Sequence, residues 1–334
     1  MAEMLKIDNI KKTFNPGTIN EKVALNGVNL SLEEGDFVTV IGGNGAGKST
    51  TLNAIAGVWP VDSGKIYIGG DDVTRLSEYK RAKYLGRVFQ DPMTGTATTM
   101  SIEENMAIAA RRGQSRGLSW GITKKERDVY REMLATLDLG LEDRLSSKVG
   151  LLSGGQRQAI TLLMASIQKP RLLLLDEHTA ALDPATAEKV LELTRRVVAE
   201  SHITCLMVTH NMTQALALGN RTLMMADGGI VLDLKGPQVP WASGNAWAPA
   251  VIERRQDDGT YRYFLYYSGH SDELGRKVIG VAVADDPAGP FYDCGRPIVT
   301  DSPAGHGQQI DVDVFRDPVS GKYYLYWGNG YMAG

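Results

Sequence analysis

Residues 42–49 read GGNGAGKS and directly follow the apolar run 37–41. Glycines let backbone N–H groups turn toward phosphate oxygens that a side chain would otherwise block. Lys48 supplies a positive charge for the β- and γ-phosphates, and the hydroxyl of Ser49 is a suitable Mg²⁺ ligand. A helix expected to begin near Lys48 points its positive dipole end at the same place. The pattern therefore predicts a nucleotide-binding loop rather than an inert glycine-rich turn. Its expected binding residues are Gly42, Gly43, Asn44, Gly45, Ala46, Gly47, Lys48, Ser49 and Thr50.

A carboxylate pair follows a second apolar run. Residues 172–175 are four leucines, which is typical of a strand buried on both faces, and Asp176 and Glu177 come next. Asp176 is suited to the shell of a Mg²⁺ ion, and Glu177 is suited to polarise an attacking water molecule. Acidic pairs after apolar strands are common. This pair indicates a nucleotide site only together with the loop at 42–49.

A second anion-binding pattern lies about twenty residues before the carboxylates. Residues 152–156 read LSGGQ and precede the helical stretch 157–168. A serine and two glycines at a helix start make a cradle for an anion. One domain has no use for two cradles on one γ-phosphate, so we expect this loop to serve a nucleotide bound to a second copy of the chain.

Together the three motifs resemble those of the ATP-binding cassette (ABC) ATPases of ABC transporters, over roughly residues 4–235. The resemblance implies an α/β P-loop NTPase fold of ABC type at 1–236, with a helical subdomain at about 91–165. It also implies that two copies sandwich two ATP molecules with Mg²⁺, and that closure excludes bulk water. The implied partners are a second ATPase subunit, membrane permease subunits and a solute-binding lipoprotein, with the chain peripheral at the cytoplasmic face of the cell membrane.

Four more positions match this family. Phe14 matches the aromatic residue that stacks on adenine, and Gln90 matches the glutamine that senses Mg²⁺ and contacts the membrane subunit. Asp183 matches the loop at the dimer interface, and His210 matches the switch histidine that contacts the γ-phosphate. Each has a simpler alternative: a core aromatic residue, a surface glutamine, a helix N-cap before a proline, and a structural histidine. The nucleotide-binding residues implied by the family thus also include Phe14, Ser153, Gly154, Gly155, Gln156 and Asp183. The implied catalytic residues are Glu177, His210 and Gln90, with Ser49, Gln90 and Asp176 at the metal.

The chain departs from the family after Glu177, where His178 stands in place of the usual proline. We assign His178 no catalytic role. A subset of cassettes resembling the ATPases of amino-acid importers carries the same EHTAALDP stretch, here residues 177–184. This favours amino acids or similar small solutes as the cargo, although other subunits select the substrate. By its resemblance to this family, a chain with a single stand-alone cassette is expected to serve import. A non-transport ABC ATPase is the alternative, but neither a second cassette nor a long coiled-coil insertion is present.

The composition of the chain limits the expected partners and the expected cellular compartment. The net charge of −3 argues for no polyanion partner such as nucleic acid. Cys205 and Cys294 lie far apart in the sequence, which indicates a reducing compartment rather than a disulfide framework. No apolar stretch approaches the ~20 residues that span a bilayer, and residues 1–8 lack a secretory signal.

The character of the chain changes at about 234–240. Nine aromatic residues precede Pro237 and fifteen follow it, in strand-like runs such as 261–267 and 322–327. Residues 238–334 resemble family 43 glycoside hydrolases through WAPA at 247–250, IGVAVA at 279–284, GPF at 289–291, and IDVDVF at 310–315 before YLYWGNG at 324–330. The second domain, 237–334, is therefore expected to be an all-β fragment of a five-bladed propeller, comprising about two blades.

Glycosidase activity is not expected from this fragment. The resemblance places Asp311 at the carboxylate that tunes the general acid, but an inverting glycosidase needs two further carboxylates on either side of the scissile bond. Neither has a counterpart here. The sequence stops inside the family pattern, which favours a fusion of two unrelated coding pieces. The competing interpretation is a carbohydrate-sensing appendage.

Overall fold

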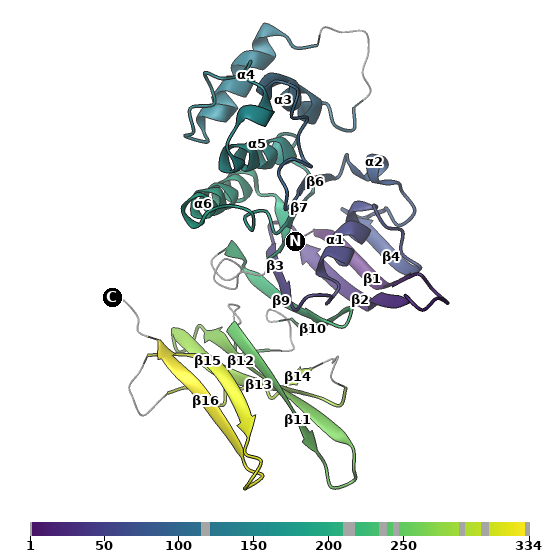
Figure 1. The fold of residues 1–334 in the computed structure, drawn as a ribbon, viewed down its shortest axis with the longest axis vertical. Helices are drawn as coiled ribbons and strands as arrows, with labels where there is room; N and C mark the ends of the chain where they lie inside the picture. The colour runs from purple at the N-terminus through teal and green to yellow at the C-terminus, as the bar shows by residue number, and fades with distance from the viewer. Residues whose placement is uncertain are drawn as a thin grey trace. The chain divides into compact units, whose positions relative to one another are not determined.

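The computed structural model describes residues 2–114, 121–209, 218–233, 239–242, 247–286, 291–301 and 307–330 (Figure 1). His210 and most of the expected boundary at 234–240 lie outside these residues. The chain divides into two compact units, which are described separately. Unit 1 comprises Met1–Lys12, Asn29–Asp36 and Ser49–Val208. Unit 2 comprises Thr13–Val28, Phe37–Lys48 and Thr209–Gly334.

Between residues 37 and 208 helices separate most of the strands, as in βαβ units, whereas the first three strands follow one another directly. The strands are β1 (Glu3–Phe14), β2 (Lys22–Glu33), β3 (Phe37–Gly42), β4 (Ser63–Ile68), β5 (Asp71–Asp72), β6 (Leu85–Val88), β7 (Leu172–Asp176), β8 (Thr204–Val208), β9 (Arg221–Ala226) and β10 (Gly229–Asp233). The helices are α1 (Lys48–Ala56), α2 (Glu78–Arg81), α3 (Ile102–Ala110), α4 (Lys124–Ala135), the 3-10 helix η1 (Val149–Leu151), α5 (Gly154–Ser166) and α6 (Pro184–Ser201).

Only strands follow residue 240 in the described chain. They are β11 (Trp247–Arg255), β12 (Tyr261–Ser271), β13 (Arg276–Ala284), β14 (Tyr292–Asp293), β15 (Gln308–Arg316) and β16 (Tyr323–Gly330).

In unit 1, β6, β7 and β8 pair in parallel, with Leu172 opposite both Leu85 and Thr204. The four leucines of β7 have no solvent exposure, as expected for a central strand covered on both faces. Strand β4 pairs antiparallel with β1 and with β5. Helix α5 packs against α6, α3 and β6. The carboxyl end of β7, where the acidic pair lies, is thus fixed by its neighbours on each side.

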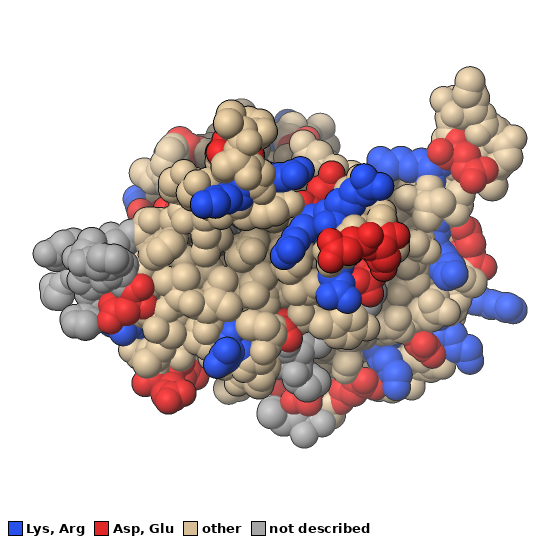
Figure 2. All heavy atoms as spheres, turned by 90° about the horizontal axis from the view of Figure 1, so that it is seen from below, with Lys and Arg blue, Asp and Glu red and all other residues tan. Residues whose placement is uncertain are grey.

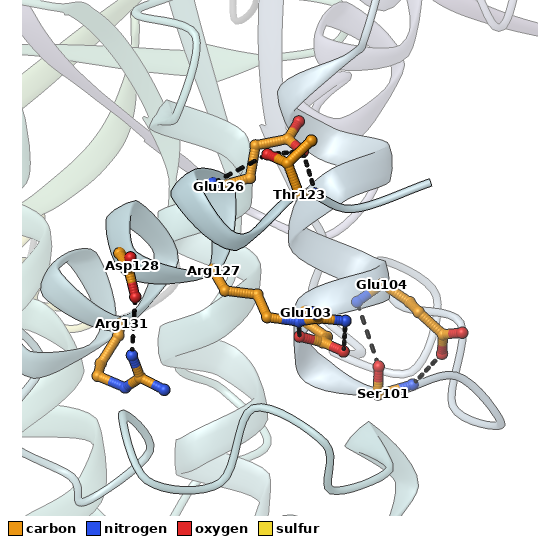
Figure 3. Close-up of polar contacts among 8 residues, drawn as sticks. All are labelled: Ser101, Glu103, Glu104, Thr123, Glu126, Arg127, Asp128 and Arg131. Atoms are coloured by element: carbon orange, nitrogen blue, oxygen red, sulfur yellow. Dashed lines mark hydrogen bonds and ion pairs between the residues drawn. The ribbon is translucent and has the colours of Figure 1, made fainter. Parts of the chain in front are cut away.

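Helices α3 and α4 are defined at their starts by capping boxes (Figure 3). The side chain of Ser101 accepts from the backbone N–H of Glu104, whose carboxylate accepts from the backbone N–H of Ser101. Thr123 and Glu126 repeat this arrangement at α4. An ion pair links the two helices, since Arg127 donates from both Nε and Nη2 to the Glu103 carboxylate, at 2.7 and 3.3 Å. The Arg127 side chain is 47% exposed, so solvent screens this pair, which fixes orientation more than it adds stability.

In unit 2, β3 pairs in parallel with β9, and β9 pairs antiparallel with β10. Strands β11–β14 form an antiparallel sheet in sequence order, and β15 and β16 form a two-stranded sheet. The all-β character expected of the C-terminal region is confirmed. A five-bladed propeller is not seen in the described residues, which supply one four-stranded sheet and one pair of strands.

The C-terminal sheet shares an apolar cluster with strands β3, β9 and β10. The buried members of this cluster are Ile41, Met224, Val231, Leu232, Val239, Ala242, Leu265, Tyr267, Ala282, Ala284 and Phe291. The backbone N–H of Phe291 donates to the carbonyl of Val231. Trp241 stacks on Tyr267 with ring centroids 5.8 Å apart, and its indole N–H donates to Asp293. Trp241 is therefore anchored to strands β12 and β14.

The surface carries both signs of charge. Figure 2 shows one face, on which Lys and Arg side chains are interspersed with Asp and Glu around a broad area of other residues. Several aromatic side chains on β15 and β16 are exposed, among them Phe315, Tyr324 and Tyr326. Among the residues that the structure describes, no helix combines the length and apolar character needed to cross a bilayer.

Candidate functional site

The loop after β3 is shaped by close backbone approaches that only glycine permits. At Gly47 the backbone has φ +98°, and an added Cβ would lie 2.7 Å from the carbonyl oxygen of Ala24. At Gly42 the φ is +151°, and an added Cβ would collide with the carbonyl oxygen of Met225. Both glycines are therefore required by the fold of the loop itself.

The Lys48 side chain lies inside this loop. Its Nζ donates to the carbonyl oxygens of Gly42 and Gly43, at 2.8 and 2.9 Å. Lys48 is buried, whereas residues 43–45 are exposed to solvent. The structure thus places a positive charge beneath a loop that solvent can reach, and this fits a nucleotide phosphate. Ser49 and Thr50 follow in the first turn of α1.

Two alanine substitutions in this loop provide a matched test. We expect Gly47→Ala to lower the free energy of unfolding by about 1–3 kcal/mol, because the new Cβ meets backbone at a positive φ. Gly43→Ala should be nearly neutral, because nothing lies within 4 Å of its added Cβ. Chemical denaturation of both variants measures the difference. Equal stability of the two would contradict the loop geometry.

The acidic pair ends β7 in a strained turn. Glu177 has φ +46°, a left-handed conformation that non-glycine residues rarely adopt. The strain is held by backbone hydrogen bonds from Glu177 to Val208 at 3.0 Å and from Ala180 to Glu177 at 2.9 Å. Such outliers concentrate at functional sites, where neighbouring structure fixes a side chain in place.

Asp176 is largely buried beside a cation. Its carboxylate lies 3.7 Å from the Nη2 atom of Arg87, and the two side chains are 16% and 14% exposed. Burial lowers the pKa of the Arg87 guanidinium, while the Asp176 charge acts in the opposite direction. No local sequence pattern singles out Arg87, because its partners lie 34 and 89 residues away in the chain.

His178, to which no catalytic role is assigned, contacts the next helix through its side chain. Its Nε2 lies 3.0 Å from the hydroxyl of Thr194, which donates in turn to the carbonyl of Val190. The imidazole is almost completely buried, and its Nδ1 has no hydrogen-bond partner. His178 therefore ties the turn after β7 to the middle of α6.

Burial lowers the pKa of His178 from 6.5 to about 4. The unfolded chain then binds the proton more readily than the folded chain between these values, so stability falls as the pH drops from 6.5 toward 4. We expect this residue to cost roughly 2–3 kcal/mol of stability between pH 7.5 and pH 4.5. The His178→Gln side chain stays neutral over this range. Its free energy of unfolding, measured by urea denaturation, should therefore fall by roughly 2–3 kcal/mol less than that of the wild type between pH 7.5 and pH 4.5. An unchanged pH dependence would mean that His178 titrates normally in the folded protein.

The Ser153 loop and the Asp183 turn lie against each other in unit 1. Ser153 caps α5 in a capping box with Gln156, and Asp183 caps α6 by accepting from the backbone N–H of Thr186. The hydrogen bonds from Thr186 lower the pKa of the Asp183 carboxyl below its ordinary value. A Cβ added at Gly155 would collide with the methyl group of Thr186. The starts of α5 and α6 are therefore in close contact.

The remaining expected site residues are more dispersed. Gln90 is exposed two residues after β6, and Phe14 is half-buried at the end of β1. His210 falls outside the described residues, so its position stays a prediction. Among the described residues, no group of three or more His, Cys, Asp or Glu side chains could hold a metal. Ser49, Asp176 and Gln90, the residues expected at Mg²⁺, would offer it one hydroxyl, one carboxylate and one amide oxygen.

Comparison with known proteins decides the family. Residues 25–180 match the ABC transporter family. Over 237 residues the chain is 44% identical to the tyrosine transport ATP-binding protein of Clostridioides difficile (strain R20291), covering 70% of this chain and 92% of the relative. The chain belongs to the ABC transporter family. This cassette is accordingly an ATP-binding and ATP-hydrolysing subunit of an ABC transporter.

Further comparisons give the same family for the cassette. It is 35% identical over 237 residues to the lipoprotein-releasing system ATP-binding protein LolD of Ruegeria sp. (strain TM1040), covering 69% of this chain and 99% of the relative. Among solved structures it resembles the dimeric bacterial ABC transporter cassette MJ0796, with 30% identity and a TM-score of 0.60 over 69% of this chain and 97% of that chain. Residues 229–333 match glycosyl hydrolases family 43, which confirms the resemblance of the C-terminal region.

Proposed function

We propose that this cassette powers the import of an amino acid or a similar small solute, as one of two ATPase subunits beneath separate permease subunits. The 44% identical tyrosine transport ATP-binding protein supports this cargo class, together with the EHTAALDP stretch at 177–184. A solute-binding lipoprotein would deliver the cargo on the opposite side of the membrane. The chain itself would lie peripherally at the cytoplasmic face. We place the end of the ATPase domain at residue 236 and its helical subdomain at about 91–165.

In the proposed reaction, Glu177 polarises the water that attacks the γ-phosphate. The observation that carries this role is the strained, left-handed turn that fixes Glu177 at the end of β7. Lys48 binds the β- and γ-phosphates, and His210 contacts the γ-phosphate. Phe14 stacks on the adenine. Ser49, Asp176 and Gln90 would hold Mg²⁺, which neutralises charge on the phosphates when bound.

The Ser153 loop is proposed to complete the site of a second copy. Ser153 and Asp183 cap helices α5 and α6, whose first turns contact each other at Gly155 and Thr186, and this supports a shared partner for both loops. ATP then bridges the two copies, and hydrolysis removes the γ-phosphate that holds them together. The movement between closed and open dimers would be transmitted to the permease. The test of cargo is uptake of tyrosine into vesicles that contain this chain and its permease; uptake that does not depend on ATP would contradict the proposal.

We expect the purified chain not to hydrolyse aryl arabinosides or xylosides. Asp311 is exposed on β15 with φ +54°, but the sequence supplies no counterparts for the general acid and base. A chromogenic assay is the measurement, with an active family 43 enzyme as the positive control. Release of the chromophore above the rate with Asp311→Ala would contradict the expectation.

A further inference from the structure

Arg87 lies beside one residue proposed to hold Mg²⁺, Asp176, and is linked through Asn53 to another, Ser49. It lies on β6, and its Nη2 donates to the side-chain oxygen of Asn53 at 2.8 Å. The side-chain N–H of Asn53 donates to the backbone carbonyl of Ser49, also at 2.8 Å. The same Nη2 atom lies 3.7 Å from the carboxylate of Asp176. One arginine thus connects the turn that carries Ser49 with the end of β7.

The guanidinium is held in place from its other side. Its Cζ atom lies 4.5 Å from the ring centroid of Phe89, within the range of a cation–π contact. The backbone carbonyl of Phe89 accepts from the side chain of Gln158 on α5 at 3.2 Å. The Nε atom of Arg87 is buried without a hydrogen-bond partner. The unpaired Nε costs free energy. The contacts with Asn53 and Phe89 therefore hold the guanidinium in this position.

A fixed positive charge beside Asp176 has a defined electrostatic effect. It stabilises the carboxylate while no metal is bound, and it repels a divalent cation that approaches the same carboxylate. Both side chains are mostly buried, so solvent screens this repulsion only in part.

We propose that Arg87 is a positioning residue that serves as the internal counter-ion of Asp176 and competes with Mg²⁺ for it, so that it sets how strongly nucleotide binding depends on the metal. This inference rests on the proposed Mg²⁺–ATP site. Arg87 touches neither nucleotide nor water in this scheme. It acts only through Asp176 and, by way of Asn53, through Ser49.

The test is calorimetric titration of the full chain with ADP, once with Mg²⁺ and once with EDTA. The ratio of the two affinities is the readout, because a general loss of structure would weaken both. In Arg87→Met we expect the Mg²⁺-dependent ratio to rise about tenfold over that of the wild type. Arg87→Lys, which keeps the charge, should return the ratio to within about threefold of the wild type. Arg87→Gln, which keeps a donor for Asn53 without the charge, should behave as Arg87→Met does even where the latter folds poorly.

Arg171→Met is the matched control. Arg171 also lies beside an aromatic ring, that of Tyr84, and also forms an ion pair, with Asp71, which is not one of the proposed metal-binding residues. Its ratio should equal that of the wild type. A ratio that is unchanged or lower in both uncharged Arg87 variants, while ADP still binds in EDTA, would overturn the role of Arg87 alone. Failure of the wild-type chain to bind ADP under either condition would overturn the nucleotide site and the inference together.

Discussion

Replacing Glu177 by Gln should leave ATP binding intact and reduce the rate of ATP hydrolysis by about 10²–10⁴-fold. The amide keeps the size of the side chain and can occupy the same strained turn, but it cannot polarise water by accepting its proton. Phosphate release under saturating ATP measures turnover, and titration with ATP measures binding. Wild-type turnover in this variant would remove Glu177 from the role of base.

Asp183→Asn is the control for this substitution. It removes a neighbouring carboxylate by the same chemical change, and asparagine is as good a helix N-cap as aspartate. Its effect on turnover should be much smaller than that of Glu177→Gln, because Asp183 is proposed to act at the interface between copies. Equal losses in the two variants would point to general disruption of the α6 turn.

Lys48→Ala should weaken ATP binding roughly 10- to 100-fold, which corresponds to the loss of about 1.5–3 kcal/mol from hydrogen bonds to a charged group. The Lys48 ammonium already points into the loop, where it bonds to the carbonyls of Gly42 and Gly43. Its replacement removes the charge and leaves these carbonyls without their donor.

Fluorescent ATP titration measures this effect, and Lys65→Ala serves as the control. Lys65 is an exposed lysine on β4 that lies over the ring of Tyr67. The Lys65→Ala variant should bind ATP with the affinity of the wild type. Equal affinity of the Lys48 and Lys65 variants would contradict the assignment of the loop.

Local patterns predicted the elements that carry the site. The leucines of β7 form a buried strand because a parallel strand covered on both faces needs a continuous apolar run. Ser153 begins a helix because its side chain satisfies a free backbone N–H, and Asp183 before Pro184 does the same. Each of these signals depends on residues close together in the chain, so the sequence alone is sufficient.

Contacts between distant residues could not be predicted in this way. The partner of His178 is Thr194 on the next helix, and nothing in the sequence around either residue specifies the pair. In the sequence Arg87 resembles any other strand residue. Only the pairing of β6 with β7 places its guanidinium beside Asp176. The sharing of an apolar cluster by β9, β10 and the C-terminal sheet was likewise not expected from two regions of different character.

The central claim is that the nucleotide loop forms half of a site that a second copy completes through Ser153. Light scattering of Glu177→Gln with ATP and Mg²⁺ tests it most directly, because this variant should trap the nucleotide before hydrolysis. We expect a monomer without nucleotide and a dimer with ATP, and we expect the double variant Glu177→Gln/Ser153→Arg to bind ATP but remain a monomer. An ATP-saturated Glu177→Gln chain that stays monomeric, or a Ser153→Arg double variant that dimerises equally well, would contradict the claim.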